Sequence, residues 1–120
     1  MAKAKALIVD DNIHMAEVLA EMLGVFQLGA LTTQDGETAL RSLATETVSI
    51  VITDLRMPKM SGVELLKSIK VQHPELPVVV VSGYNLSPED DRAVRTMADG
   101  FLNKPFKMQD IQALLDRLVR

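Results

Sequence analysis

Hydrophobic residues occur along this chain in two alternating patterns. The first is a short, continuous apolar run, which is typical of parallel strands buried on both faces. Residues 6–9 and 77–81 show it most clearly, together with residues 50–52, whose strand ends at Asp54. Residues 28–33 form a weaker candidate, and residues 100–103 form a short fifth one. The sequence therefore predicts five strands.

Between these runs, apolar residues recur at steps of three and four, which indicates amphipathic helices. Residues typical of helix starts precede them: Asp11 or Asn12 for the first helix, Asp35 for the second, and Ser61 with Glu64 for the third. Strands and helices that alternate five times predict an α/β fold. Its parallel sheet would carry helices on both faces, joined by right-handed crossovers.

The fourth predicted helix has the narrowest apolar face. It runs from Pro88 to Ala98, with proline at its first position, and its apolar residues are Ala93, Val94 and Met97. Such a face buries little apolar surface. This helix is therefore expected to be held least firmly.

Composition narrows the functional classes. With 120 residues, of which 48% are hydrophobic, the chain is expected to form one domain over residues 1–120. A net charge of −3 argues against direct nucleic-acid binding, and the lack of cysteine excludes disulfides and thiolate metal sites. No apolar run has the roughly 20 residues of a membrane span, and the first is too short for a signal peptide. A cytoplasmic location is expected.

Polar residues that could do chemistry end or directly follow four of the five predicted strands. They are Asp10 and Asp11, Asp54, Ser82 and Lys104. Each has a simple structural explanation on its own, as a helix cap, a turn residue or a solvated side chain. However, parallel strands share a carboxyl edge, and ligands of open α/β sheets bind there. The shared position indicates a common site.

Three carboxylates at one edge of a sheet repel one another and require a cation. Oxygen ligands without cysteine or histidine favour Mg²⁺, or Mn²⁺, over zinc. A lysine and a hydroxyl beside such an ion can both donate to phosphoryl oxygens, and an aspartate can form an acyl phosphate. The residues thus predict a site for a phosphoryl group, with one carboxylate as the nucleophile.

Four segments resemble the response-regulator receiver domain of two-component signalling, a CheY-like family. They are Val9–Asp11, Asp54–Gly62, Val81–Gly83 and Phe101–Phe106, and the resemblance runs from about Lys5 to the C-terminus. It implies a single doubly wound (βα)5 receiver domain. The five-stranded parallel sheet would have the strand order 2-1-3-4-5.

The resemblance also implies a role for each acidic residue. Asp54 would be the phosphoacceptor. Asp10 and Asp11 would hold Mg²⁺, with Mn²⁺ as a possible substitute, together with Asp54 and the backbone carbonyl of Arg56. In this assignment the acceptor is itself a metal ligand.

Further roles fall on the last two strands. Ser82 and Lys104 would bind phosphoryl oxygens, and the bond from Lys104 to Pro105 would be cis, which proline makes inexpensive. Phe101 occupies the family's aromatic switch position. Phosphorylation would move Ser82 and the ring, and with them the surface of the fourth helix, fifth strand and fifth helix.

The implied function is that of a phosphorelay receiver. It would take a phosphoryl group from a sensor histidine kinase or a histidine phosphotransfer protein and control an effector domain or protein. It would not be an enzyme beyond its own phosphorylation and dephosphorylation, and it would bind neither nucleic acid nor membrane. Dimerisation on phosphorylation is compatible with this function.

Two alternatives remain beside it. A phosphatase of the haloacid-dehalogenase type needs an acid two residues after its nucleophile, where this chain has Arg56. A receiver relic, acting as a phosphorylation-independent interaction module, usually lacks one of the five polar residues, and this chain keeps all of them. The sequence names neither the kinase nor the output, which belongs to a stand-alone receiver or to a larger regulator or hybrid kinase.

Overall fold

Strands and helices alternate along the chain as predicted. The computed structural model describes residues 5–57, 60–82 and 87–119, apart from the side chain of Ser82. The strands are β1 (Lys5–Val9), β2 (Gly29–Thr33), β3 (Ile50–Asp54), β4 (Val78–Ser82) and β5 (Gly100–Asn103). The helices are α1 (Ile13–Val25), α2 (Gly36–Thr45), α3 (Gly62–Gln72), α4 (Pro88–Met97) and α5 (Met108–Leu118).

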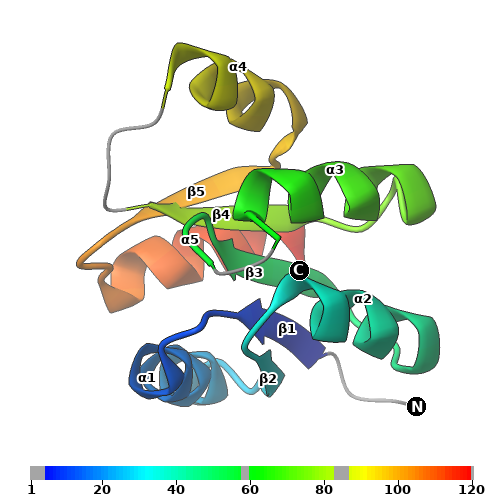
Figure 1. Cartoon of the computed structure of the whole chain (residues 1–120). Coiled ribbons are helices and arrows are strands. Elements are labelled where there is room, and N and C mark those ends of the chain that lie inside the picture. The colour runs from blue at the N-terminus through cyan, green and yellow to red at the C-terminus, as the bar shows by residue number, and fades with distance from the viewer. Residues whose placement is uncertain (1–4, 58–59, 83–86, 120) are drawn as a thin grey trace.

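The strands form one parallel sheet in the order β2-β1-β3-β4-β5, which confirms the predicted fold class (Figure 1). In the register, Val9 of β1 lies opposite Thr53 of β3, and Asp54 lies opposite Val81 of β4. Because β1 and β3 are neighbours, the residues that come next, 10 and 54, lie side by side at the carboxyl edge of the sheet.

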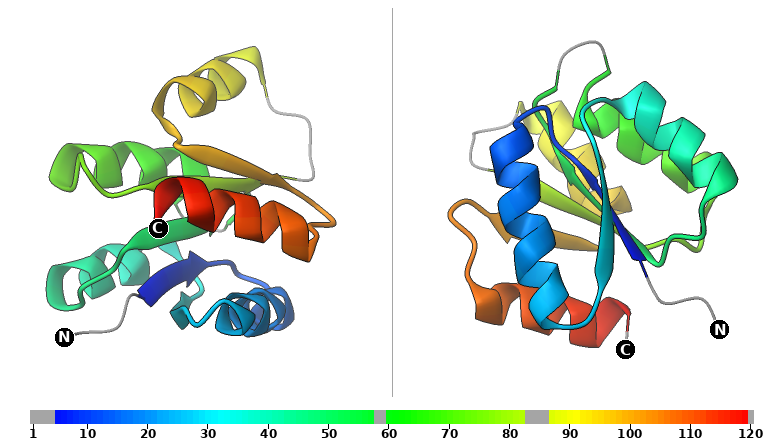
Figure 2. Two further views of the ribbon diagram at one scale, coloured as in Figure 1. Left: turned by 180° about the vertical axis from the view of Figure 1, so that it is seen from behind. Right: turned by 90° about the horizontal axis from the view of Figure 1, so that it is seen from below.

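Helices cover both faces of the sheet, as the continuous apolar strands require. Figure 2 shows α1 and α5 on one face and α2, α3 and α4 on the other. Alternate strand residues enter two cores: Ile8 and Ile52 pack with α1 and α5, whereas Leu7 and Val51 pack with the other helices. Both faces of the central strands are therefore buried.

Among the five helices of the described residues, four are capped by side chains at their N-termini. Asn12, Asp35, Ser61 and Ser87 each accept a hydrogen bond from the backbone N–H three residues further along. For the first helix the sequence left Asp11 and Asn12 open, and the structure selects Asn12. These bonds satisfy N–H groups that have no partner within the helix.

Four elements have predicted boundaries that shift by one residue. Strand β1 begins at Lys5 rather than residue 6, and β2 begins at Gly29 rather than residue 28. The fourth strand spans 78–82 rather than 77–81, since Pro77 has no N–H for the ladder and contributes only its carbonyl, which accepts from the Val51 N–H at 2.9 Å. The fourth helix ends at Met97 because Ala98 has extended backbone angles.

The fourth helix is held by a narrow apolar face, as the sequence predicts. Val94 is the one buried side chain of α4, all of whose residues are described, and Ala93 and Met97 are partly buried beside it. Figure 1 shows α4 standing over the β5 side of the sheet, next to α3. In the described part of the chain, no helix is long and apolar enough to cross a membrane.

Candidate functional site

Three aspartates meet at the carboxyl edge of the sheet. Asp10, Asp11 and Asp54 each offer an oxygen, and these oxygens all lie within 4.8 Å of one another. Asp10 and Asp54 are 7% and 5% exposed, whereas Asp11 is exposed. Two nearly buried carboxylates and one accessible carboxylate therefore share one end of β1 and β3.

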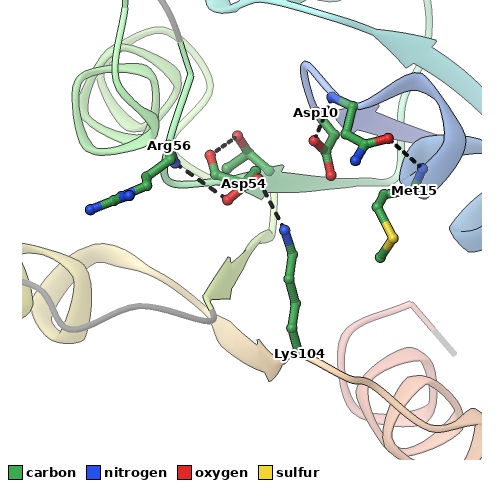
Figure 3. Close-up of polar contacts among 7 residues, drawn as sticks. Asp10, Met15, Asp54, Arg56 and Lys104 are labelled. Atoms are coloured by element: carbon green, nitrogen blue, oxygen red, sulfur yellow. Dashed lines mark hydrogen bonds and ion pairs between the residues drawn. The ribbon is translucent and has the colours of Figure 1, made fainter.

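Lys104 reaches this group from the far side of β4. Its Nζ lies 3.2 Å from Oδ2 of Asp54 and donates to it, although the two residues are 50 positions apart in sequence (Figure 3). Lys104 follows β5 directly, and the bond from Lys104 to Pro105 is cis. The parallel order of β3, β4 and β5 thus brings the ammonium group to the same edge as the carboxylates.

Backbone groups fix two of the carboxylates in place. The N–H of Asn12 donates to Oδ1 of Asp10 at 2.9 Å, and the N–H of Arg56 donates to Oδ1 of Asp54 at 3.3 Å (Figure 3). In both cases the loop after the strand folds back on the acid that ends the strand. The orientation of each carboxylate is therefore set by the chain that follows it.

The close approach of these acids changes the electrostatics of Asp10. Burial raises the pKa of Asp10 above its usual 3.8, and the neighbouring charges of Asp54 and Asp11 raise it further. The Asn12 N–H and the Lys104 ammonium oppose this rise. Since Lys104 carries one positive charge against three carboxylates, the site retains an excess of negative charge.

The donor set fits a hard divalent cation. Among the described residues, these aspartates form the one group of acidic or histidine side chains that could hold a metal ion. They offer only oxygen, which suits Mg²⁺ or Mn²⁺. The charge excess points the same way. Asp11, the exposed member, borders a hollow of about 490 Å³ that Leu55, Arg56, Met57 and Ser61 also line.

Gly62 fixes the loop after Asp54, a role that the sequence pattern alone does not reveal. Its N–H donates to the carbonyl of Leu55 at 3.0 Å, and a Cβ at this position would overlap the carbonyl oxygen of Asp54 and the Cα of Leu55. The signal in the sequence is a glycine at the first position of a helix, directly after the N-cap Ser61. Helix α3 thus begins in direct contact with the peptide of Asp54.

The other predicted site residues lie on β4 and β5. Ser82 ends β4 and lies opposite Asn103, one step beyond the pairing of Asp54 with Val81; its side chain lies outside the described part. Phe101 lies on β5 and is 47% exposed. Pro58, Lys59 and Gly83, which belong to the motif segments, lie outside the described residues.

Comparison with known proteins places this geometry in a family. The chain matches the family model of the response regulator receiver domain over residues 6–116. The DNA-binding transcriptional regulator NtrC of Klebsiella pneumoniae is 36% identical over 122 residues, covering 99% of this chain and 25% of NtrC. The two-component response regulator ORR5 of Oryza sativa subsp. japonica is 37% identical over 117 residues, covering 95% of this chain and 87% of ORR5. The chain thus spans a quarter of one relative and most of the other.

A solved structure agrees with these sequence matches. The chemotaxis protein CheY4 of Vibrio cholerae superimposes with a TM-score of 0.87 at 29% identity, over 98% of this chain and 100% of CheY4. Its likeness confirms the CheY-like fold that the motif segments implied. With the family match and the sequence relatives, it establishes that the chain belongs to the response regulator receiver domains of two-component systems.

Proposed function

We propose that the chain is a phosphorelay receiver that accepts a phosphoryl group on Asp54. The observation that carries the proposal is the cluster at the carboxyl edge, where Asp10, Asp11 and Asp54 lie within 4.8 Å of one another and Lys104 contacts Asp54 at 3.2 Å. This arrangement supplies a nucleophile, a cation site and a fixed positive charge. Those are the parts that phosphoryl transfer to a carboxylate needs.

The transfer joins Asp54 to the phosphorus of a phosphohistidine on a sensor histidine kinase or a phosphotransfer protein. A carboxylate oxygen forms the new P–O bond while the P–N bond of the donor breaks, and the imidazole leaves with the electron pair. The product is an aspartyl phosphate, and water later cleaves it to aspartate and inorganic phosphate. The chain thus undergoes one transfer per signal rather than acting as an enzyme on a pool of substrate.

Asp10 and Asp11, with Asp54 and the backbone carbonyl of Arg56, would hold Mg²⁺, or Mn²⁺ in its place. The bound ion would offset the charge of the phosphoryl oxygens and of the carboxylates. Asp10 is buried and fixed by the Asn12 N–H, whereas Asp11 is exposed beside the hollow. The accessible acid would therefore meet the incoming ion first.

Lys104 and Ser82 would bind the transferred group. Lys104 already points at Asp54, so its ammonium can pass from the carboxylate to a phosphoryl oxygen without crossing the site. Ser82 stands one residue past the strand partner of Asp54, and its hydroxyl would donate to a second phosphoryl oxygen. Both groups would bind the phosphorylated state more strongly than the free one.

The output would follow from a change in the surface of α4, β5 and α5. Helix α4 is anchored by Val94, and Phe101 on β5 is 47% exposed. Contacts made to phosphate by Ser82 and Lys104 would favour a second packing, in which Phe101 turns inward and α4 shifts. Phosphorylation would thus change the relative populations of these two packings.

The partner of this surface would be an effector domain or protein, or a second copy of the chain in a phosphorylation-driven dimer. NtrC is named a DNA-binding transcriptional regulator and is about four times as long as the matched region, whereas ORR5 is little longer than it. Both architectures accommodate this receiver. We place its action in the cytoplasm, without direct contact to nucleic acid or membrane.

Intact-protein mass spectrometry after incubation with acetyl phosphate and Mg²⁺ tests the proposal. We expect the mass to rise by one phosphate, and we expect no rise with Asp54→Asn or with a chelator. The Asn side chain keeps the shape of the acceptor and its contact with the Arg56 N–H, so it is the matched control. No rise with either acetyl phosphate or a phosphorylated histidine donor would contradict the proposal and favour a phosphorylation-independent interaction module.

A further inference from the structure

A buried hydroxyl precedes the proposed acceptor. Thr53 lies in the middle of the sheet, between Val9 of β1 and Val80 of β4, and is 0% exposed. Every earlier residue of β3 is aliphatic, and valine would match the shape of threonine at this position. A hydroxyl in such a place needs a hydrogen bond, since an unpaired buried one is costly.

The hydroxyl of Thr53 donates to the backbone carbonyl of Asp54 at 2.9 Å. This carbonyl belongs to the peptide that links the acceptor to the loop after β3. From the other side, Gly62 lies so close that a Cβ would overlap the same oxygen, and its N–H donates to the carbonyl of Leu55. The peptide between Asp54 and Leu55 is thus held between a side chain of β3 and the start of α3.

The position of the peptide between Asp54 and Leu55 affects the orientation of the Asp54 carboxylate. The N–H of Arg56 donates to Oδ1 of Asp54, while Lys104 donates to Oδ2, so both oxygens are held by groups outside the side chain. The position of the Arg56 N–H depends on the two peptides before it, and the first of these is the peptide that Thr53 fixes. A rotation of that peptide would displace the Arg56 N–H and allow the carboxylate to turn.

We propose that Thr53 is a positioning residue for phosphoryl transfer, which acts by fixing the peptide of Asp54. The inference rests on the proposed function of Asp54 as acceptor. Transfer requires one oxygen of Asp54 to face the phosphorus in line with the leaving group, and small misplacements of reacting groups slow such steps strongly. Thr53 touches neither donor nor phosphate, and its effect passes through the backbone.

Two substitutions separate the hydroxyl from the methyl group. Thr53→Val keeps the shape and removes the hydrogen bond. Thr53→Ser keeps the hydroxyl and leaves a methyl-sized cavity, which lowers stability. At saturating acetyl phosphate and Mg²⁺, we expect Thr53→Val to take up phosphate roughly three- to tenfold more slowly and Thr53→Ser to stay near the wild-type rate.

Thr33 provides the matched control. It is also a buried threonine of a strand, and its hydroxyl donates to the backbone carbonyl of Ile8 at 3.3 Å rather than to that of Asp54. We expect Thr33→Val to leave the uptake rate close to wild type. Uptake rates that follow the urea-unfolding stabilities of the three variants, rather than the presence of the Thr53 hydroxyl, would overturn the proposal.

A second measurement distinguishes a failure of this inference from a failure of the proposed function. In metal-free protein without donor, amide hydrogen exchange at Arg56 reports on the bond to Oδ1 of Asp54. We expect faster exchange in Thr53→Val than in Thr53→Ser or wild type. Equal exchange in all three would overturn the positioning role, even if wild-type protein takes up phosphate. Absence of uptake in wild type would instead remove the proposed function.

Discussion

Two lysine–aspartate pairs stand at opposite ends of the same sheet. At the carboxyl edge, Nζ of Lys104 lies 3.2 Å from Oδ2 of Asp54. At the amino edge, Nζ of Lys70 at the end of α3 lies 2.5 Å from Oδ2 of Asp99, in the turn between α4 and β5. The residues are of the same two types, yet their surroundings differ.

The amino-edge pair is balanced in charge, and each partner also makes a hydrogen bond to the backbone. Asp99 also accepts from the N–H of Val78 at 2.8 Å, and Lys70 also donates to the carbonyl of Leu76 at 2.9 Å. The carboxyl-edge pair lies beside Asp10 and Asp11, whose negative charges repel that of Asp54. A balanced pair joins elements of the fold, whereas a pair within an excess of negative charge attracts a cation.

Removing each lysine should separate these two roles most strongly. Lys104→Met keeps the length of the side chain but leaves the phosphoryl oxygens without its charge, and we expect uptake of phosphate to fall roughly 100-fold or more. Lys70→Met removes the same charge at the far edge and should change uptake by less than about threefold. Initial rates by mass spectrometry with acetyl phosphate and Mg²⁺ measure both.

Circular dichroism of the two variants provides the control for folding. A Lys104→Met protein that is folded and still takes up phosphate at the wild-type rate would contradict the role of this lysine. A Lys70→Met protein that is folded and loses uptake as strongly as Lys104→Met would contradict the assignment of Lys70 to the fold alone.

Among these substitutions, removal of Asp99 should have the largest effect on stability. Asp99→Ala leaves the partly buried Lys70 without its partner and the Val78 N–H without an acceptor, and we expect a loss of about 2 kcal/mol. Asp99 is 36% exposed, so solvent screening keeps the loss below that of a fully buried pair. Asp99→Asn can still accept from Val78, and should lose about half as much. Urea unfolding measures both; a loss below about 0.5 kcal/mol for Asp99→Ala would show that the pair does not join these elements.

The strands, the helix starts and the meeting of the acids at the carboxyl edge could be predicted from sequence, because they depend on local patterns and on strand topology. Continuous apolar runs marked the strands, and side chains such as Asp35 and Ser61 marked the helix starts. The meeting of the acids after β1 and β3 followed from the shared carboxyl edge of parallel strands. Residues that end strands are thus positioned by topology, before any packing detail is known.

Other contacts could not be predicted, since they depend on how helices pack. Lys70 and Asp99 are 29 positions apart, and nothing in either segment marks them as partners. Thr53 looks like part of an apolar run, and its hydrogen bond to the carbonyl of Asp54 depends on a loop conformation. Gly62 was part of a motif, but the overlap that excludes a Cβ arises only when α3 docks on the end of β3.

Magnesium should stabilise the folded domain through the acids of the carboxyl edge alone. If the acids bind Mg²⁺, the free energy of unfolding rises by about 1.4 kcal/mol when the free ion is at ten times its Kd. Asp99→Asn should show the same increase, because its substitution lies at the other edge, and Asp11→Asn should show little or none. Urea titrations with and without Mg²⁺ measure the increments. Equal increments in wild type and Asp11→Asn would place the bound ion elsewhere.

The smallest expected effect is a gain of stability when a charge is removed from the carboxyl edge. The pKa of Asp10 is raised in the folded protein, chiefly by burial and then by the charges of Asp54 and Asp11. Folding therefore takes up protons in the window between the unfolded value near 3.8 and the raised folded value. The resulting stabilisation is fully present below that window and is lost as the pH rises through it.

At neutral pH, in a chelator, Asp10→Asn should accordingly be more stable than wild type, since the amide keeps an acceptor for the Asn12 N–H without the charge. The advantage should shrink as the pH falls toward 3.8, where wild-type Asp10 becomes protonated. Asp99→Asn should be less stable than wild type at neutral pH, because the substitution removes a carboxylate whose charge Lys70 balances. Thermal melts of the three proteins across this pH range test the contrast. A destabilised Asp10→Asn at neutral pH would mean that Lys104 already balances the carboxylates, and the carboxyl edge would then hold no charge excess to attract a cation.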